Sequence, residues 1–353
     1  MMNVLMVGVD KGRIGGMWTV AETFIDSIEF NNKVNLYYVA TSTGGSVTKR
    51  VLKMLQGYAK IFWILLTRRI DIIHIHMAEK GSVYRKGVVV KLGKIFGKKV
   101  IVQMHAGPIL NWYESLSYKR QKRVSQILSS SDRMLVLGKF WKYQIKTLIP
   151  EEKIRVLYNG ALCASYNQYN VDGDILLYLG LLKKTKGTYD LVDAVKLIDK
   201  EIPQQIKIYL CGIDEKEDMP QYIEERNLQD RFVLLGWIDH NQKLELFKRT
   251  AICVLPSYFE ALSMTVIEAM CYGIPVVTTD ISTMRELVGA DVLLTQPGDI
   301  RALADHIKNL LLNRQMRINY SKHLYARATE QFSIEENIKN TLQIYNELVG
   351  FSK

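Results

Sequence analysis

The chain has 353 residues, 48% hydrophobic and 24% charged, a composition typical of a soluble globular protein. This length suits two domains of about 150 to 180 residues each. The apolar run at 61–66 is far shorter than the roughly 18 residues that a membrane-spanning helix needs, and the first residues enter a strand pattern without signal-peptide features. We therefore expect a cytoplasmic protein whose four scattered cysteines are reduced, namely Cys163, Cys211, Cys253 and Cys271.

Charge divides the chain into two unequal parts. Residues 1–163 contain 26 Lys and Arg against 10 Asp and Glu, whereas residues 164–353 contain 21 against 26. This asymmetry indicates that the two parts meet different partners. A basic surface suits nucleic acid, an anionic membrane or a phosphate-bearing acceptor, and charge alone leaves all three open.

The first part alternates strand and helix patterns. A strand at 2–9 is followed by a loop with Gly15 and Gly16 and then by a helix to about residue 30. Such alternation predicts a parallel sheet with helices on both faces, whose ligands bind beyond the carboxyl ends of the strands. Further strands are predicted at 34–40, 70–76, 99–104, 133–137 and 154–157, and further helices at about 46–67, 82–97, 116–129 and 139–148.

Several features of this part have both a structural and a functional interpretation. His74, His76 and His105 end neighbouring strands, where a histidine is more often structural than functional. The helix at 46–67 has an apolar side and cations at its ends. It is either packed in the core with solvated cations or partly inserted at an anionic bilayer surface. Arg85 and Lys86 either flank the next helix or hold an acceptor phosphate, and Trp112 and Tyr113 lie where a sugar or a headgroup could stack.

A segment without periodicity, at 161–173, is interpreted as the linker between domains 1–163 and 164–332. It contains Asp172-Gly173-Asp174, which matches an Asp-x-Asp metal signature of the other nucleotide-sugar fold. Because the triplet lies in the linker, we interpret it as a turn. A second strand and helix alternation follows, with strands at 175–179, 206–211, 231–235, 251–255, 276–279 and near 292–294, and late helices at about 300–315 and 333–349.

The segment 256–277 carries the strongest signal. Glu260 and Glu268 are eight positions apart, and Ser263 is a suitable start for the helix that contains the second of them. Two glutamates at this spacing are, alone, more often a solvated helix face. Here they lie between two buried strands, and the backbone N–H groups from Ala261 to Thr265 together with the positive helix end suit a diphosphate.

This whole pattern resembles the Glu-x7-Glu signature of retaining glycosyltransferases of the GT-B fold, specifically family 4 (glycosyltransferase group 1) of the bacterial surface-polysaccharide type. The resemblance covers nearly the whole chain and is strongest over 175–300. It implies an α/β protein of two Rossmann-like domains with parallel sheets facing across a cleft. It also implies that the C-terminal helix at 333–353 packs back on the first, acceptor-binding domain.

The resemblance also implies roles for particular residues. Glu260 and His105 would hold the donor sugar, Lys186 would neutralise the leaving diphosphate, and Glu268 would bind the ribose hydroxyls. The remaining donor-binding candidates are Gly15, Gly16, Lys183, Trp237, Ile238, Ala261, Leu262, Ser263, Met264 and Thr265, with core packing as the alternative for Trp237 and Ile238. The acceptor-side candidates are His76, Arg85, Lys86 and Tyr113.

One position departs from the family pattern. The family loop Gly-Arg-Leu-x-x-x-Lys-Gly reads here from Gly180 to Gly187, with Lys186 in the lysine position and Leu181 in place of the arginine. Either Lys183 or Lys184 supplies the missing charge, or the donor is bound with one cation.

The expected function is therefore that of a retaining, metal-independent hexosyltransferase without a cofactor. It would move a sugar from a nucleotide-diphosphate sugar, with UDP as the nucleotide, to a saccharide acceptor that is polyprenyl-phosphate-linked. This would serve capsule or O-antigen biosynthesis, peripherally at the inner face of the cytoplasmic membrane. Three alternatives stay open: a catalytically weak donor-binding partner subunit, a GT-B nucleotide-sugar epimerase, and a nucleic-acid-binding protein, which only the charge favours.

Overall fold

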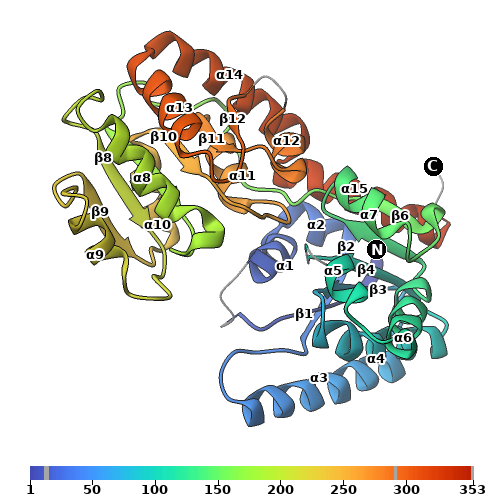
Figure 1. Ribbon diagram of the computed structural model, residues 1–353. Helices are drawn as coiled ribbons and strands as arrows, with labels where there is room; N and C mark the ends of the chain where they lie inside the picture. The colour runs from blue at the N-terminus through green and yellow to red at the C-terminus, as the bar shows by residue number, and fades with distance from the viewer. Residues whose placement is uncertain (12–15, 106, 108, 290–291, 351–353) are drawn as a thin grey trace. The chain divides into compact units, whose positions relative to one another are not determined.

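The computed structural model describes residues 1–11, 16–105, 107, 109–289 and 292–350. The chain divides into two compact units (Figure 1). The first unit consists of Met1–Asn159 together with Ile334–Lys353, and the second unit is Gly160–Ser333. Each unit contains a parallel sheet of six strands with helices packed against it, which confirms the predicted α/β class.

The first unit has the strand order β2-β1-β3-β4-β5-β6. Strand β1 lies between β2 and β3, with Val4 opposite both Leu36 and Ile72. Buried Val, Ile and Leu side chains fill both faces, as in other parallel sheets. The strands are β1 (Met2–Gly8), β2 (Val34–Ala40), β3 (Ile72–Met77), β4 (Lys99–Met104), β5 (Arg133–Val136) and β6 (Ile154–Val156).

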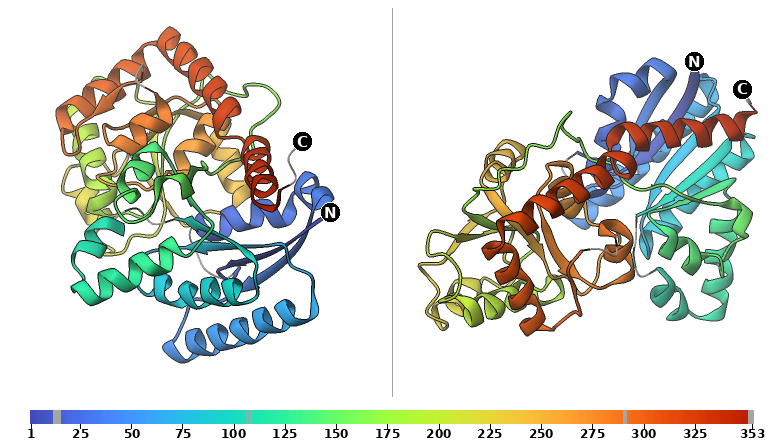
Figure 2. Two further views of the ribbon diagram at one scale, coloured as in Figure 1. Left: turned by 90° about the vertical axis from the view of Figure 1, so that its right-hand side faces the viewer. Right: turned by 90° about the horizontal axis from the view of Figure 1, so that it is seen from above.

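Helices cover this sheet, and one of them comes from the far end of the chain (Figure 2). Helix α15 (Ile334–Val349) contributes Ile338, Leu342 and Tyr345 to the same core as Met6 and Phe24. The other helices are α1 (Gly16–Asp26), α2 (Ile28–Lys33), α3 (Val47–Thr67), α4 (Gly81–Ile95), α5 (Ile109–Glu114), α6 (Tyr118–Ser129), α7 (Lys139–Ile145) and the short η1 (Glu151–Lys153).

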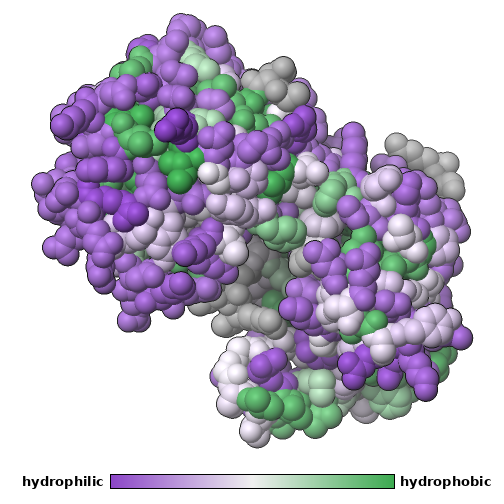
Figure 3. Space-filling model, in the orientation of Figure 1, coloured by the Kyte–Doolittle hydropathy of each residue, from purple (hydrophilic) through white to green (hydrophobic). Residues whose placement is uncertain are grey.

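Two expectations about these helices need correction. The single helix predicted to reach residue 30 is two helices, because the Ser27 hydroxyl accepts the N–H of Phe30 at 3.1 Å and starts α2. In α3, Ile61, Ile64 and Leu65 are buried, but most of the predicted apolar side is exposed, so core packing accounts for only part of the apolar residues of this helix. Figure 3 shows a hydrophobic area on the first unit in the region where Figure 1 draws α3.

The second unit has the strand order β12-β11-β10-β7-β8-β9. Its strands are β7 (Ile175–Leu179), β8 (Lys207–Cys211), β9 (Phe232–Gly236), β10 (Thr250–Leu255), β11 (Val276–Thr279) and β12 (Leu294–Thr295). Its helices are η2 (Lys184–Lys186), α8 (Thr188–Ile198), α9 (Met219–Glu224), α10 (His240–Phe247), α11 (Met264–Cys271), α12 (Ser282–Val288), α13 (Ile300–Leu312) and α14 (Arg314–Gln331).

The cysteines differ from the expectation of four reduced thiols. Cys163 forms a disulfide with Cys271, their Cα atoms lying 4.5 Å apart, because the linker returns to the C-terminal end of α11. Cys211 and Cys253 are free and buried, and burial raises the pKa of each thiol to about 12. Two cysteines 108 residues apart carry no pairing signal in the sequence, so only the fold reveals this bond.

None of the helices within the described residues is both long and apolar enough to cross a membrane. The Asp172-Gly173-Asp174 triplet lies before β7. Asp174 pairs with Arg249 at 2.5 Å and Asp172 with Arg314 at 3.3 Å. The two carboxylates thus bind arginines, which agrees with the interpretation of the triplet as a structural turn.

Candidate functional site

The candidate donor site begins where β10 ends. Pro256 follows Leu255 at the end of the buried strand, and the loop that follows leads into α11. Ser263 is the N-cap of α11, and its hydroxyl accepts the N–H of Val266 at 3.3 Å, as predicted. Glu260 therefore lies in the loop above the strand end, and Glu268 lies within α11.

A second loop, 180–187, is held tightly against the first. Gly187 has φ +68, and a Cβ atom there would lie 2.0 Å from the carbonyl oxygen of Pro256. Tyr258 N–H donates to the carbonyl oxygen of Thr185 at 3.1 Å. Only glycine satisfies both the left-handed backbone and the close approach at position 187. These two contacts fix the position of Lys186 beside the C-terminal end of β10.

Lys186 and Glu260 meet in an ion pair between these loops. Lys186 Nζ lies 2.5 Å from Glu260 Oε1, and the Ser257 hydroxyl donates to the same oxygen at 2.9 Å. The Thr283 hydroxyl holds the backbone carbonyl of Glu260 at 2.9 Å. Because the Glu260 side chain is only 11% exposed, the pair is shielded from water far more than a surface ion pair. The structure thus brings together Lys186, Glu260 and the segment Ala261 to Thr265 that starts α11.

Glu268 faces a residue that the sequence analysis missed. Lys243 Nζ, from α10, lies 2.7 Å from Glu268 Oε1, and both side chains are about four-fifths buried. A lysine in the first turn of a helix opposes the helix dipole, and this local conflict is the signal that could have indicated a functional or tertiary role.

The other donor-binding candidates differ in their exposure and in the unit to which they belong. Lys183 faces Glu215 at 3.6 Å, and Lys184 is exposed. Trp237 is 61% exposed, so core packing is the wrong interpretation for it, whereas Ile238 is partly buried. Gly16 is the first residue of α1 in the first unit, and Gly15 lies outside the described residues.

The pairing of Lys183 gives a prediction about which lysine compensates for Leu181. Because Lys183 already neutralises Glu215, Lys183→Ala should lower the rate of sugar transfer no more than severalfold, far less than removal of Lys186. Steady-state kinetics of the two variants side by side measure this difference. An equal loss in both variants would mean that Lys183 is a second diphosphate ligand.

Three histidines form a stacked row in the first unit. His74 and His76 have ring centroids 4.9 Å apart, and His76 Nδ1 lies 2.8 Å from His105 Nε2. His74 contacts the Tyr345 hydroxyl at 2.6 Å and Gln103 Oε1 at 3.1 Å. Burial lowers the pKa of His74 to about 4, and burial together with its neighbours lowers the pKa of His76 well below 6.5. Burial also lowers the pKa of His105. The row is therefore neutral near pH 7.

This row predicts acid sensitivity of the first unit. An unfolded chain protonates histidine near pH 6.5, whereas native His74 resists protonation until about pH 4. The unfolded state therefore binds more protons in this window, and the opening free energy should fall as the pH drops, by up to about 1.4 kcal/mol per pH unit for each buried histidine. Hydrogen exchange of the β3 amides measures it. His74→Gln should reduce the slope, and a slope equal to wild type would contradict the assignment. Substitution of His240, which is exposed, is the control.

Two of the acceptor-side candidates are buried, and the other two are partly buried. His76 and Lys86 are buried, and Lys86 Nζ donates to the carbonyl oxygen of Gly8 at 2.9 Å. Arg85 is partly buried in α4, and the Tyr113 hydroxyl contacts Ser125 Oγ at 3.0 Å. Across the described residues, no three His, Cys, Asp or Glu side chains gather as they would around a metal ion.

The sequence was compared with known protein families and with curated proteins. Residues 164–328 match the family model "Glycosyl transferases group 1". A Klebsiella pneumoniae protein, "Uncharacterized 41.2 kDa protein in cps region", is 23% identical over 297 residues, covering 78% of this chain and 80% of that protein. The Escherichia coli "O-antigen chain mannosyltransferase B" is 28% identical over 171 residues, covering 48% of this chain and 45% of its own.

Two solved structures share the fold over essentially their whole length. Sucrose-phosphate synthase from Thermosynechococcus elongatus has a TM-score of 0.79 at 19% identity, with complete coverage of both chains. Anabaena HepE, solved in complex with UDP and glucose, has a TM-score of 0.73 at 15% identity, covering 98% of this chain and all of the other. Residues 164–328 therefore match the glycosyl transferases group 1 family, and the chain as a whole has the GT-B fold of these solved structures.

Proposed function

We propose that the protein is a retaining glycosyltransferase that moves a hexosyl group from a UDP-sugar to a lipid-linked saccharide acceptor in bacterial surface-polysaccharide synthesis. The observation that carries this proposal is the shielded Lys186–Glu260 pair beside the start of α11. The binding of UDP by HepE supports the nucleotide. The names of the Klebsiella and Escherichia relatives support the pathway class.

The proposed chemistry needs charge stabilisation at the leaving group. When the bond between the sugar C1 and the diphosphate oxygen breaks, negative charge grows on the diphosphate and positive charge on the sugar ring. Lys186 and the backbone N–H groups at the start of α11 would stabilise the diphosphate without a metal ion. Glu260 would accept hydrogen bonds from the sugar hydroxyls. The acceptor oxygen then attacks C1 on the face that the diphosphate leaves, and its proton passes to a phosphate oxygen.

The second ion pair fits the nucleoside end of the donor. Glu268 would accept hydrogen bonds from the ribose hydroxyls, and the ion pair with Lys243 would orient this carboxylate in the absence of donor. Trp237 offers an exposed indole ring near the end of β9 on which the base can stack. His105, Gly15 and Gly16 stay predictions for the donor, on the first unit.

The test is hydrolysis and transfer across a panel of UDP-, GDP- and dTDP-sugars. We expect turnover of one UDP-sugar, unchanged by EDTA, with a product anomer, assigned by NMR, that matches the donor. Turnover with GDP- or dTDP-sugar alone would overturn the nucleotide assignment. Inversion at C1 would overturn the mechanism, and loss of activity in EDTA would overturn metal independence. A C2-epimerised sugar without acceptor would identify an epimerase.

One observation favours a second candidate function, a donor-binding partner subunit with weak activity. Leu181 occupies the position of the family arginine, and Lys183 beside it is paired with Glu215. In this case the wild type would bind UDP-sugar without turnover, even with membrane lipid extract added, and Leu181→Arg would restore hydrolysis. Turnover by the wild type rejects this candidate.

We also propose that α3 docks the first unit on an anionic bilayer. One exposed side of the helix is apolar, with Trp63 67% exposed, and the helix contains no acidic residue. Cations line another side and both ends, including Lys49, Arg50 and Lys60. An apolar stripe beside cations matches a bilayer surface with anionic headgroups. The exposed apolar residues of α3 are Val47, Val51, Leu52, Leu55, Phe62, Trp63 and Leu66.

Vesicle sedimentation tests this docking. Binding to phosphatidylglycerol vesicles should exceed binding to phosphatidylcholine vesicles, because each lysine or arginine near an anionic surface contributes about 1 kcal/mol. The double variant Trp63→Ser/Leu66→Ser should weaken binding about tenfold or more, since it removes two exposed apolar side chains that would be buried in the bilayer. Trp237→Ser, which removes a similarly exposed tryptophan from the second unit, is the matched control. Equal losses in both variants would contradict docking through α3.

A further inference from the structure

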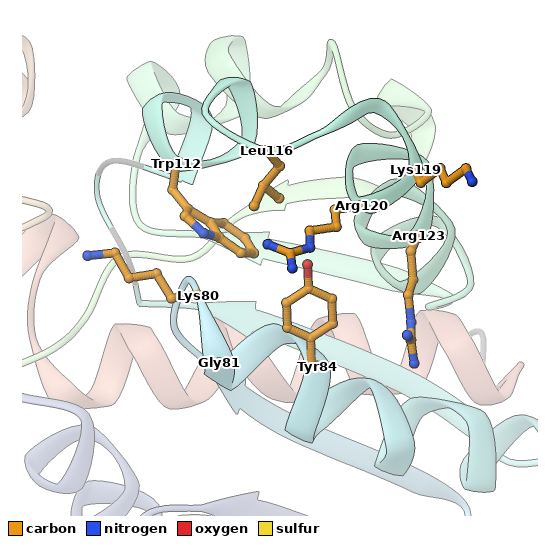
Figure 4. Close-up of a pocket in the computed structure, with 8 residues that line it drawn as sticks. All are labelled: Lys80, Gly81, Tyr84, Trp112, Leu116, Lys119, Arg120 and Arg123. Carbon is orange, nitrogen blue, oxygen red and sulfur yellow. The ribbon is translucent and has the colours of Figure 1, made fainter.

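A basic and aromatic pocket lies in the first unit, and none of its lining residues belongs to the donor-binding candidates. It has a volume of about 730 Å³, within the usual range for small-ligand sites. The start of α4, helix α5 and helix α6 form its walls (Figure 4). The side chains used below are Lys80, Tyr84, Trp112, Lys119, Arg120 and Arg123.

The charge of this pocket is uncompensated. Four of its lining residues are cations and none is acidic. Among the described residues, none of these four takes part in an ion pair, whereas Lys94, at the other end of α4, pairs with Asp132 at 2.9 Å. Cations held close together without a counter-charge repel one another, and a bound anion removes this repulsion. The pocket therefore favours an anionic ligand.

Tyr84 adds a hydrogen-bonding group that has no partner. Its hydroxyl oxygen is buried, and no described residue hydrogen bonds to it. In Figure 4 the hydroxyl points into the pocket, toward the guanidinium group of Arg120. Leaving a buried hydroxyl unpaired is costly, and such groups in native proteins usually have a partner. A ligand oxygen in the pocket would supply that partner.

The aromatic rings indicate what accompanies the anion. The rings of Tyr84 and Trp112 meet edge to face with centroids 6.2 Å apart, and the Arg123 guanidinium lies 5.8 Å from the centroid of Tyr84. Figure 4 shows the Trp112 indole, from α5, beside Tyr84, from α4, and both side chains line the pocket. Indole faces pack well against the C–H side of a sugar ring.

We propose that this pocket binds a sugar phosphate, with the phosphate at Arg120, Arg123 and Lys80, a phosphate oxygen accepting the Tyr84 hydroxyl, and the sugar against Trp112. This inference rests on the proposed function, for which it supplies the acceptor site. The same chemistry is offered by a free sugar phosphate and by a lipid-linked one, and the bound form distinguishes them.

Titration calorimetry with defined probes tests the pocket directly. We expect glucose 1-phosphate to bind more tightly than inorganic phosphate, and glucose alone to bind least. Arg120→Gln/Arg123→Gln should weaken the binding of glucose 1-phosphate at least about tenfold, since two charge-assisted hydrogen bonds are lost. Lys122→Gln, which removes a neighbouring exposed cation of α6 outside the pocket, should leave it unchanged. An equal effect of Lys122→Gln, or absence of binding, would overturn the proposal.

Tyr84→Phe separates ligand binding from a structural role. It removes a hydroxyl that has no partner among the described residues, so thermal stability should stay equal or rise while sugar phosphate binding falls. A loss of stability with unchanged binding would overturn the assignment of Tyr84.

Two further measurements distinguish a free from a lipid-linked sugar phosphate and test the pocket separately from the proposed transferase activity. A polyprenyl phosphate carrying one sugar, in micelles, competes with glucose 1-phosphate, and the tighter of the two ligands is the source. Donor hydrolysis without acceptor reports the proposed transferase alone and should be unchanged in the pocket variants. Binding without hydrolysis would therefore refute the transferase and keep the pocket, and hydrolysis without binding would do the reverse.

Discussion

Replacement of Lys186 by methionine is expected to lower kcat for sugar transfer by about 10²–10³-fold, the usual loss when one stabilising donor at a developing anion is removed. Methionine keeps the length of the side chain and removes only its charge. In the donor-free enzyme this charge is engaged 2.5 Å from Glu260, and the diphosphate would compete for it. Rapid-quench measurement of a single turnover reports the chemical step. Lys184→Met, in the same loop but exposed, is the matched control and should stay within about twofold.

The ion pair requires a second variant for a clear conclusion. Lys186→Met also leaves the shielded Glu260 carboxylate without its cation, which alone disturbs the loop. Glu260→Gln and the double variant complete a mutant cycle. If Lys186 acts on the diphosphate, the double variant stays as slow as Lys186→Met. Recovery of the rate in the double variant would show that the lysine only neutralises Glu260.

Replacement of Tyr345 by alanine should destabilise the first unit by about 3–5 kcal/mol, as for other large aromatic side chains removed from a core. Tyr345 is fully buried in α15, packs against Phe30 and contacts His74 Nδ1 at 2.6 Å. Tyr345→Phe keeps the ring and removes only the hydroxyl, so it should cost about 1–3 kcal/mol. Denaturant unfolding followed by hydrogen exchange separates the units. The amides of β10 in the second unit should keep their protection. Equal destabilisation of both units would contradict this.

Most strands were predictable because they are short buried runs of branched apolar residues bounded by turn signals, as in β1, β3, β7 and β10, although β2 and β9 are largely not buried. Two helices of the second unit, α12 and α14, were not predicted. The buried side of α14 consists of Arg317, Ser321, Leu324 and Ala328, so its periodicity is helical but not hydrophobic. Arg317 is buried because it donates to the carbonyl oxygens of Leu310 and Leu311. Polar groups that satisfy a neighbouring helix end leave no amphipathic pattern to detect.

The candidate site was predictable only where its residues are close in sequence. Glu260, Ser263 and Glu268 share one strand-loop-helix segment, so their placement follows from local rules. Lys243 meets Glu268 only through the packing of α10 beside α11, and Tyr84 faces Trp112 only through the packing of α4 beside α5. Contacts of this kind depend on tertiary geometry, which neither spacing nor periodicity encodes.

The place of α15 in the core of the first unit has a consequence for synthesis of the protein. The first unit is built from two stretches of chain, and the whole second unit is translated between them. A nascent chain that has reached residue 333 has a complete second unit, but its first unit still lacks the surface that covers His74 and Phe30. Part of the hydrophobic core of the N-terminal sheet therefore stays exposed to solvent until α15 has been synthesised. This delay makes the first unit the half of the protein that depends most on chaperones.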